Sequence, residues 1–356
     1  MTIFDKNTSK DTFLKAIVHD PRLFVEDLDL SFEGRWRIAP TTPSDFKQST
    51  FLDNRIKLSD PNQKWVLPTS DILNLNIVEN KSIKYIFHIS HVGSTLISKL
   101  LDECERVYSL REPVILRKLA AYKAEIDSPE SFVEPRIIEA AIKQSQLLLA
   151  RPFDPSQTVI VKASSFTNEL SDSILGGVLR PTSLMIYCKI NVFLPVIFKG
   201  NGWGDIIGLS RSRILRLYKM LDNKFCCLYS LSPGELIAMN WLCEMMTLFL
   251  SAQNHPAQVM WIDFDDFLLR KSEYISDISK HLGLNLTDAE QMAIVQSELF
   301  SKYSKNDSIQ FNAEDRAREL KEVNLKHEKE IEKGILWLCN LSSRFDLVKT
   351  IVNKFV

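Results

Sequence analysis

The chain has 356 residues, of which 45% are hydrophobic and 25% are charged, a balance that excludes a disordered chain and a coiled-coil fibre. Its 44 Lys and Arg residues nearly match its 45 Asp and Glu residues and leave a formal charge of −1. Such a chain has no global basic field for a nucleic-acid backbone or an anionic membrane surface. We therefore expect no nucleic-acid partner, and we expect any anion site to be local.

Targeting signals and metal motifs are absent from the sequence. The first residues lack the basic-then-apolar run of a signal peptide, and no window of about 18 residues is free of charged and strongly polar side chains. These features predict a cytoplasmic protein without a membrane span. The six cysteines show no CxxC spacing and the six histidines show no HExxH pattern, so we expect reduced core thiols and no metal site.

Residues 1–80 differ in pattern from the rest of the chain. A short helical segment near residues 11–20 is followed by a stretch with few periodic apolar positions, which is broken by Pro40, Pro43, Pro61 and Pro68. We interpret this part as an N-terminal lobe or wrapping arm, followed by a main domain over residues 81–356.

After residue 80, short apolar runs alternate with helical patterns. The runs are rich in β-branched and aromatic residues, as is typical of strands buried on both faces of a parallel sheet, and cover residues 83–89, 158–162, 184–188 and 259–262. The helical patterns cover residues 95–105, 134–150, 192–199, 211–221 and 234–251. This order predicts an α/β fold with a mostly parallel sheet flanked by helices. The pattern of roughly the last ninety residues predicts that this region is helical throughout, with an amphipathic helix over residues 302–333.

The segment after the first apolar run is the most informative. Residues 90–95 read Ser-His-Val-Gly-Ser-Thr, and apolar residues from Leu96 onward mark a helix face. A strand, a tight turn around Gly93 and a helix start together place backbone N–H groups around a phosphate or sulfate, which Gly93 allows to approach closely. The nucleotide-hydrolase form G-x-x-x-x-G-K-[ST] is not met, because Ser94 stands where that form has lysine. A capped helix start without any ligand is the alternative interpretation.

This loop resembles the donor loop of the sulfotransferase family, which reads approximately [KR]-S-G-T-T-[LW]. The residues at these six positions are, in order, His91 at the basic position, Val92, Gly93 at the glycine, Ser94 and Thr95 at the hydroxyls, and Leu96. The resemblance implies a P-loop sulfotransferase-like fold and the co-substrate 3′-phosphoadenosine 5′-phosphosulfate, whose 5′-phosphosulfate the loop would hold without a metal. It also implies that His91 donates to the sulfate or bridging oxygen, and that the acceptor is a hydroxyl or amine of a small molecule, peptide or glycan.

Glu112 follows one helix and one short strand after the loop, within the sequence Val-Tyr-Ser-Leu-Arg-Glu-Pro over residues 107–113. In bacterial and tyrosyl-protein sulfotransferases a glutamate at about this separation takes the proton of the acceptor, so the resemblance implies that role for Glu112. A carboxylate within hydrogen-bond reach of that proton assists attack on sulfur. The alternative is a surface ion pair between Arg111 and Glu112.

The chain departs from the family at the site of the donor's 3′-phosphate. The family pattern R-x-P-x-x-x-x-x-S is replaced by Lys189 at the arginine position and Ile197 at the serine position. We expect Lys189 to contact the donor. A nearby basic run either supplies compensating charge or forms the solvated face of a helix, and it consists of Arg211, Arg213, Arg216 and Lys219.

Two other functions stay open at this point. Asp263, directly after the run 259–262, resembles the magnesium-binding carboxylate of kinases and ATPases, although the missing loop lysine argues against a P-loop nucleotide kinase or hydrolase. If the chain is a sulfotransferase, Asp263 is structural, because sulfuryl transfer needs no metal. The third possibility is a catalytically degenerate sulfotransferase-like binding protein, since His91 and Ile197 are the kind of replacements that loss of activity would produce.

Overall fold

The computed structural model describes residues 9–53, 55–56, 58–60, 62–77, 83–200, 202–303, 306–310 and 312–356, with the backbone alone for 306–309. Part of the expected N-terminal lobe, including residues 1–8, lies outside these described residues. The chain forms two compact units. Unit 1 comprises Met1–Ile86, Ser98–Ser183 and Lys280–Asn285, and unit 2 comprises Phe87–Ile97, Leu184–Ser279 and Leu286–Val356. A domain boundary near residue 80 stays a prediction.

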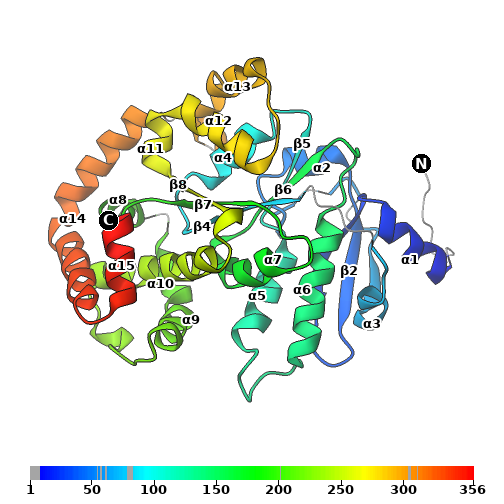
Figure 1. Cartoon of the computed structure of the whole chain (residues 1–356), viewed down its shortest axis with the longest axis horizontal. Helices are drawn as coiled ribbons and strands as arrows, with labels where there is room; N and C mark the ends of the chain where they lie inside the picture. Colours follow the sequence, from blue (N-terminus) through cyan, green and yellow to red (C-terminus); the bar gives the residue numbers. More distant parts are fainter. Residues whose placement is uncertain are drawn as a thin grey trace. The chain divides into compact units, whose positions relative to one another are not determined.

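A five-stranded sheet has the strand order β5-β6-β4-β7-β8 (Figure 1). Its strands are β4 (Lys84–His88), β5 (Val107–Arg111), β6 (Thr158–Lys162), β7 (Ser183–Tyr187) and β8 (Val259–Asp263). Both β4 and β5 pair in parallel with β6, and almost every residue of these three strands is buried. The predicted α/β fold with a mostly parallel sheet flanked by helices is therefore confirmed, and each predicted apolar run forms one strand.

The direction in which successive strands are added to the sheet reverses at β4. After β4 the chain continues to β5 and β6 on one side of it, whereas β7 and β8 lie on its other side. In open α/β sheets, ligands bind outside the carboxyl ends of the strands at such a reversal. The segments that leave β4 and β7 therefore lie where a ligand site is expected.

Unit 1 contains a second, antiparallel sheet that the sequence analysis does not predict. Strand β2 (Arg35–Pro40) pairs with β1 (Leu23–Asp29) on one side and with β3 (Trp65–Pro68) on the other. A register shift between Val25 and Asp27 breaks the alternation of buried and exposed residues along β1. The prolines Pro40 and Pro68 end β2 and β3, where no further ladder hydrogen bond is needed.

The helices of unit 1 are short except for α5 and α6. They are α1 (Lys10–His19), α2 (Pro43–Gln48), α3 (Thr69–Leu73), α5 (Val114–Ala124), α6 (Pro135–Leu149), the 3-10 helix η1 (Ser165–Leu170) and α7 (Ser171–Gly176). Helix α4 (Ser94–Leu101) begins in unit 2 and ends in unit 1. The helices expected near residues 11–20, 95–105 and 134–150 correspond to α1, α4 and α6.

Unit 2 is mostly helical. Its helices are α8 (Ile190–Phe198), α9 (Trp203–Leu221), η2 (Leu228–Ser230), α10 (Pro233–Asn254), η3 (Pro256–Gln258), α11 (Phe264–Leu269), most of α12 (Lys271–Leu282), α13 (Asp288–Val295), η4 (Glu298–Ser301), α14 (Ala313–Ser342) and α15 (Asp346–Phe355). Helices α10 and α14 approach so closely at Gly234 that an added Cβ would lie 1.7 Å from the carbonyl oxygen of Glu330. The predicted helical C-terminal region is confirmed. The prediction that this region is helical throughout is wrong, because β9 (Lys302–Tyr303) and β10 (Asn306–Gln310) form an antiparallel pair.

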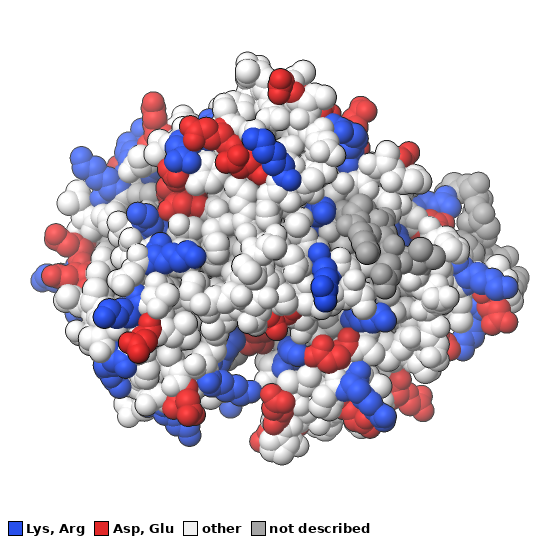
Figure 2. Space-filling view, in the orientation of Figure 1, with Lys and Arg blue, Asp and Glu red and all other residues white. Residues whose placement is uncertain are grey.

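The surface carries charges of both signs. On the face drawn in Figure 2, Lys and Arg side chains are interspersed with Asp and Glu side chains. Within the described ranges, no helix has both the length and the apolar character required to span a membrane. All six cysteines are free thiols, of which Cys104, Cys188 and Cys243 are buried. The expectation of core thiols therefore holds for these three and is wrong for the exposed Cys227 and Cys339.

Candidate functional site

The segment between β4 and α4 has the strand, tight turn and helix start that its sequence predicts. The backbone of three of its residues is left-handed, with φ values of 75° at Ser90, 53° at His91 and 66° at Gly93. The Ser90 N–H donates to Nδ1 of the buried His88 over 3.0 Å. A left-handed conformation costs a non-glycine residue about 1 to 3 kcal/mol, and such residues gather at ligand sites. Both Ser90 and His91 carry this cost.

The side chains predicted to hold the donor differ in exposure. Val92 and Leu96 are buried in the core, so their contribution to a ligand would come from the backbone. The hydroxyl residues Ser94 and Thr95 open α4 and are 4% and 3% exposed. His91 is half-buried, and its Nε2 atom lies 2.9 Å from the position that a Cβ on Gly202 would take.

Gly93 is required by packing. A Cβ on Gly93 would lie only 1.9 Å from Cε2 of Phe264, the first residue of α11. The Phe264 ring therefore gives a reason for a glycine here that differs from the anion approach expected from the sequence, which stays a prediction. The guanidinium of Arg316 lies 5.3 Å from the centre of the same Phe264 ring and 3.0 Å from Asp265 Oδ1. Arg316 is thus a cation near the loop that was not among the predicted site residues.

We expect Gly93→Ala to lower the free energy of unfolding by about 1 to 3 kcal/mol more than Gly283→Ala does, the usual cost of overpacking. Gly283 is a matched control, because both glycines have φ of 66° and the space around Gly283 is open. Guanidinium denaturation followed by circular dichroism measures the difference. Equal losses for the two variants would show that the Phe264 ring moves aside freely. Phe264→Leu should restore part of the stability lost by Gly93→Ala.

Lys189 and Asp263 lie at the ends of β7 and β8. Lys189 is exposed and directly precedes α8, whereas Ile197 is buried within that helix. Asp263 caps α11, since its Oδ1 accepts from the N–H groups of Asp265 (3.0 Å) and Asp266 (3.4 Å). Burial raises the pKa of Asp263, although these hydrogen bonds and the charge of Lys189 act against that rise. The capping role agrees with the structural interpretation of Asp263.

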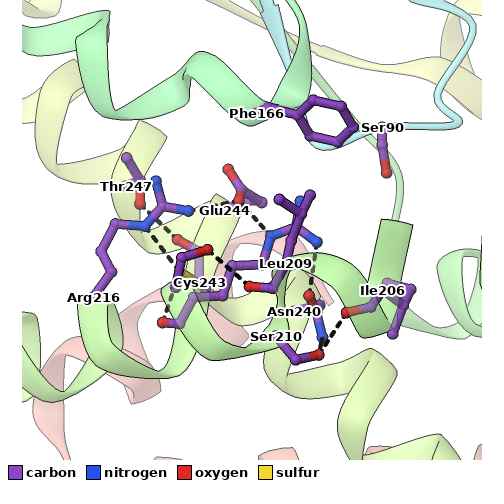
Figure 3. A network of polar contacts seen from close by, with 12 residues as sticks. Ser90, Phe166, Ile206, Leu209, Ser210, Arg216, Asn240, Cys243, Glu244 and Thr247 are labelled. Atoms are coloured by element: carbon purple, nitrogen blue, oxygen red, sulfur yellow. Dashed lines mark hydrogen bonds and ion pairs between the residues drawn. The ribbon is translucent and has the colours of Figure 1, made fainter. Parts of the chain in front are cut away.

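Only half of the basic run on α9 is a solvated face, because Arg213 and Arg216 bind Glu244 on α10 (Figure 3). Glu244 Oε1 accepts from Arg213 Nε over 2.7 Å and from Arg216 Nη2 over 2.6 Å. Arg213 Nη1 also donates to Asn240 Oδ1 over 2.7 Å. Arg213 and Glu244 are 3% and 2% exposed. These two arginines are engaged within unit 2, which leaves Arg211 and Lys219 as the exposed members of the run.

Cys243 belongs to the same network. Its Sγ atom accepts from Arg216 Nε over 3.1 Å, and burial raises the pKa of the thiol to about 11. The thiol therefore stays neutral at physiological pH.

Glu112 lies in unit 1, directly after β5, and its backbone is left-handed with φ of 58°. The proposed surface pair with Arg111 is wrong, because Arg111 is buried and binds Asp102 over 3.0 Å. Glu112 instead accepts from Lys162 Nζ at Oε1 and from Arg117 Nη2 at Oε2, the latter over 2.8 Å. Burial acts to raise the pKa of Glu112, but the charge and hydrogen bond of Lys162, followed by those of Arg117, hold it below its ordinary value.

Three further residues complete this cluster, none of which was predicted as a site residue: Lys162, Arg117 and Asp53. Lys162 is the last residue of β6. A charged residue at the end of an apolar run could have indicated a site residue. Arg117 lies in the first turn of α5, five residues after Glu112. Asp53 is 3.6 Å from Arg117 Nη2 and comes from a segment with no recognisable pattern.

No family model and no curated protein matches this chain. Among solved structures, the sulfotransferase domain from the curacin biosynthetic pathway is similar, with 11% identity and a TM-score of 0.39 over 70% of this chain and 99% of that domain. The sulfotransferase domain from the Synechococcus PCC 7002 olefin synthase shares 14% identity, with a TM-score of 0.33 over 67% of this chain and 93% of that domain.

Proposed function

We propose that the chain is a sulfotransferase that moves a sulfuryl group from 3′-phosphoadenosine 5′-phosphosulfate to a hydroxyl or amine acceptor. The observation that carries the proposal is the segment from Ser90 to Thr95. Its sequence resembles the donor loop of the family, its backbone is left-handed at Ser90, His91 and Gly93, and it leads into a helix. Successive backbone N–H groups at a helix start attract a sulfate or phosphate.

In the proposed reaction, the acceptor oxygen or nitrogen forms a bond to sulfur while the bond from sulfur to the 5′-phosphate oxygen breaks. The electron pair of the broken bond stays on the phosphate, which leaves 3′-phosphoadenosine 5′-phosphate. Hydrogen bonds from His91, from the loop amides and from Ser94 and Thr95 would stabilise the charge that develops there. Glu112 would take the acceptor proton, and the exposed Lys189 would contact the donor.

Ligand titration tests the proposal against its alternatives. We expect 3′-phosphoadenosine 5′-phosphate to bind in calorimetry without magnesium. Tighter binding of ATP with magnesium would overturn the proposal in favour of a nucleotide kinase or hydrolase. Binding of neither nucleotide would leave a sulfotransferase-like interaction protein.

Thr95→Ala should weaken the binding of 3′-phosphoadenosine 5′-phosphate by about 1 to 3 kcal/mol, because the anion loses a hydrogen-bond donor. Ser98→Ala is the matched control, since it removes a buried hydroxyl from the same helix one turn later. Both affinities are measured by calorimetry. Equal affinities for Thr95→Ala, Ser98→Ala and the parent would remove Thr95 from the donor site.

A further inference from the structure

Glu112 is shared by two cations that differ in freedom to move. Lys162, which donates to Oε1, ends β6 and has a side chain that is only 2% exposed. Arg117, which donates to Oε2, has a side chain that is 31% exposed. A buried lysine at a strand end is fixed by its surroundings, whereas a partly exposed arginine has room to turn. Of the two cations, Arg117 therefore has the more accessible side chain.

A second carboxylate lies within reach of the same arginine atom. Arg117 Nη2 is 2.8 Å from Glu112 Oε2 and 3.6 Å from Asp53 Oδ2. Asp53 is held in place by Arg55, whose Nε donates to Asp53 Oδ1 over 2.7 Å and whose Nη2 donates to Oδ2 over 2.5 Å. An ionised carboxylate accepts about four hydrogen bonds, so Asp53 has capacity for Arg117 in addition.

The segment that carries Asp53 is fixed to the strand that precedes Glu112. The N–H of Leu52 donates to the carbonyl oxygen of Arg111 over 2.7 Å. The Arg111 guanidinium donates to the carbonyl oxygens of Phe46 (2.7 Å) and Ser49 (3.0 Å). Through these bonds the buried Arg111 helps to position the segment of Asp53 relative to Glu112.

The Arg117 side chain is suited to a small rotation. Its Nε atom is buried and has no hydrogen-bond partner in the part of the chain that the structure describes. Its guanidinium lies over the Phe166 ring, 4.8 Å from the ring centre. The attraction of a cation to a ring face is not directed at a single atom, so a guanidinium can shift across the ring and keep that contact.

We propose that Arg117 is a positioning residue that moves from Glu112 to Asp53 when an acceptor binds, and so frees Glu112 Oε2 to receive the acceptor proton. This inference rests on the proposed function, in which Glu112 is the base. Lys162 stays on Oε1 throughout and keeps Glu112 ionised until the proton arrives.

The electrostatics of the cluster agree with this exchange. Among the residues that the structure describes, the groups that face Glu112 are Lys162 from β6 and Arg117 from α5, with Asp53 and Arg55 from the preceding segment beyond Arg117. Burial acts to raise the pKa of Asp53, but hydrogen bonds and charge from Arg55 and the charge of Arg117 keep it low, so Asp53 is ionised and able to receive Arg117. Loss of Arg117 from Glu112 raises the pKa of Glu112, which makes it a stronger base when it is needed.

The test is a double-mutant cycle on the titration of Glu112 itself, in the full chain labelled with 13C at the glutamate carboxyl. Glu112→Gln assigns the signal. Arg117→Ala should move the titration midpoint of Glu112 to higher pH, and Asp53→Asn should move it to lower pH, because Arg117 then has only Glu112 to bind. In the Arg117→Ala background, Asp53→Asn should have a much smaller effect. Asp20→Asn is the control, since Asp20 belongs to unit 1 but binds Arg22.

An equal effect of Asp53→Asn with and without Arg117 would overturn the inference, because Asp53 would then act by charge alone. If Arg117→Ala does not fold, Arg117→Lys serves in its place, since a lysine reaches one carboxylate but lacks the planar fork. The titration uses neither donor nor acceptor. If Asp53 and Arg117 are coupled but the Glu112→Gln variant is active, the proposed role of Glu112 is refuted. If they are not coupled and the Glu112→Gln variant is inactive, only the exchange is refuted.

Discussion

Glu112→Gln is expected to lower the rate of sulfuryl transfer by about 10²- to 10⁴-fold, the usual loss when a general base is removed. The amide keeps the shape of the side chain but takes up no proton from the acceptor. The measurement is turnover with radiolabelled donor against pooled metabolites, peptides and glycans, because the acceptor has to be found first. Binding of 3′-phosphoadenosine 5′-phosphate should stay near that of the parent. A parent-like rate with any verified acceptor would contradict the assignment.

The burial of Lys162 makes a second variant necessary. Glu112→Gln leaves the Lys162 ammonium without its carboxylate, and removal of one member of a buried pair costs about 3 to 5 kcal/mol. The double variant Glu112→Gln with Lys162→Met removes both charges and should recover stability. If it is stable and still inactive, the loss of rate comes from the missing base. If Lys162→Met restores turnover to Glu112→Gln, the defect was one of folding.

The pH dependence follows from the same contacts. The pKa of Glu112 is held below its ordinary value of 4.5 by Lys162 and Arg117, so the carboxylate is charged at neutral pH. Because the pKa of Glu112 is lower in the folded chain than in the unfolded chain, its ionisation stabilises the fold at pH values above the unfolded pKa. That stabilisation is lost as the pH falls through the folded pKa. Arg117 release in the presence of acceptor should move the acid limb of the rate profile to higher pH than the titration of the free protein.

Most of the parallel sheet was predictable because β4, β6 and β7 are almost fully buried. In the edge strand β8 only Ile262 is buried, but it too reads as an apolar run. The strands β4, β6, β7 and β8 read as unbroken apolar runs bounded by polar residues, a pattern that depends on local sequence alone. The antiparallel sheet of unit 1 was not predictable in this way. The register shift in β1 breaks the period of two on which strand prediction depends, and prolines mark the ends of β2 and β3 as loops.

The loop at Gly93 was predictable, but its packing against Phe264 was not, because the two residues are distant in the sequence. The same is true of the cluster around Glu112. Lys162 is 50 residues from Glu112, and only the pairing of β5 with β6 brings them together. Asp53 joins them through hydrogen bonds from Arg111 to the backbone of the preceding segment. Such contacts follow from tertiary structure, and local spacing carries no information about them.

The sequence around the basic run on α9 contains a pattern that indicates a buried ion pair. Ser210, Arg213, Ile214 and Leu217 follow helical spacing and form the buried face of α9, so Arg213 lies on the same side as its apolar neighbours. On α10, Glu244 is the one charged residue between Leu236 and Ala252. A single carboxylate in a buried helix requires a cationic partner, because an unpaired buried charge is strongly unfavourable. Together the two patterns predict the pair that the structure contains.

Glu244→Gln is expected to lower the free energy of unfolding by about 3 to 5 kcal/mol, because it leaves Arg213 and Arg216 without the carboxylate that both bind. Glu235→Gln is the matched control on the same helix. Glu235 accepts the Ser232 N–H over 2.7 Å in a capping box, and glutamine fulfils that role as well, so its cost should stay below about 1 kcal/mol. Chemical denaturation of both variants measures the difference.

The double variant Glu244→Gln with Arg213→Met shows whether the loss comes from uncompensated charge. Methionine fills much of the arginine volume without a charge, so the double variant should be more stable than the sum of the two single losses predicts, a coupling of about 1 to 3 kcal/mol. Additive losses would mean that Glu244 acts through its volume or its other contacts. A strong coupling would fix Arg213 as a structural residue of unit 2 and leave the donor's 3′-phosphate to other cations, of which the exposed Lys189 is the one proposed.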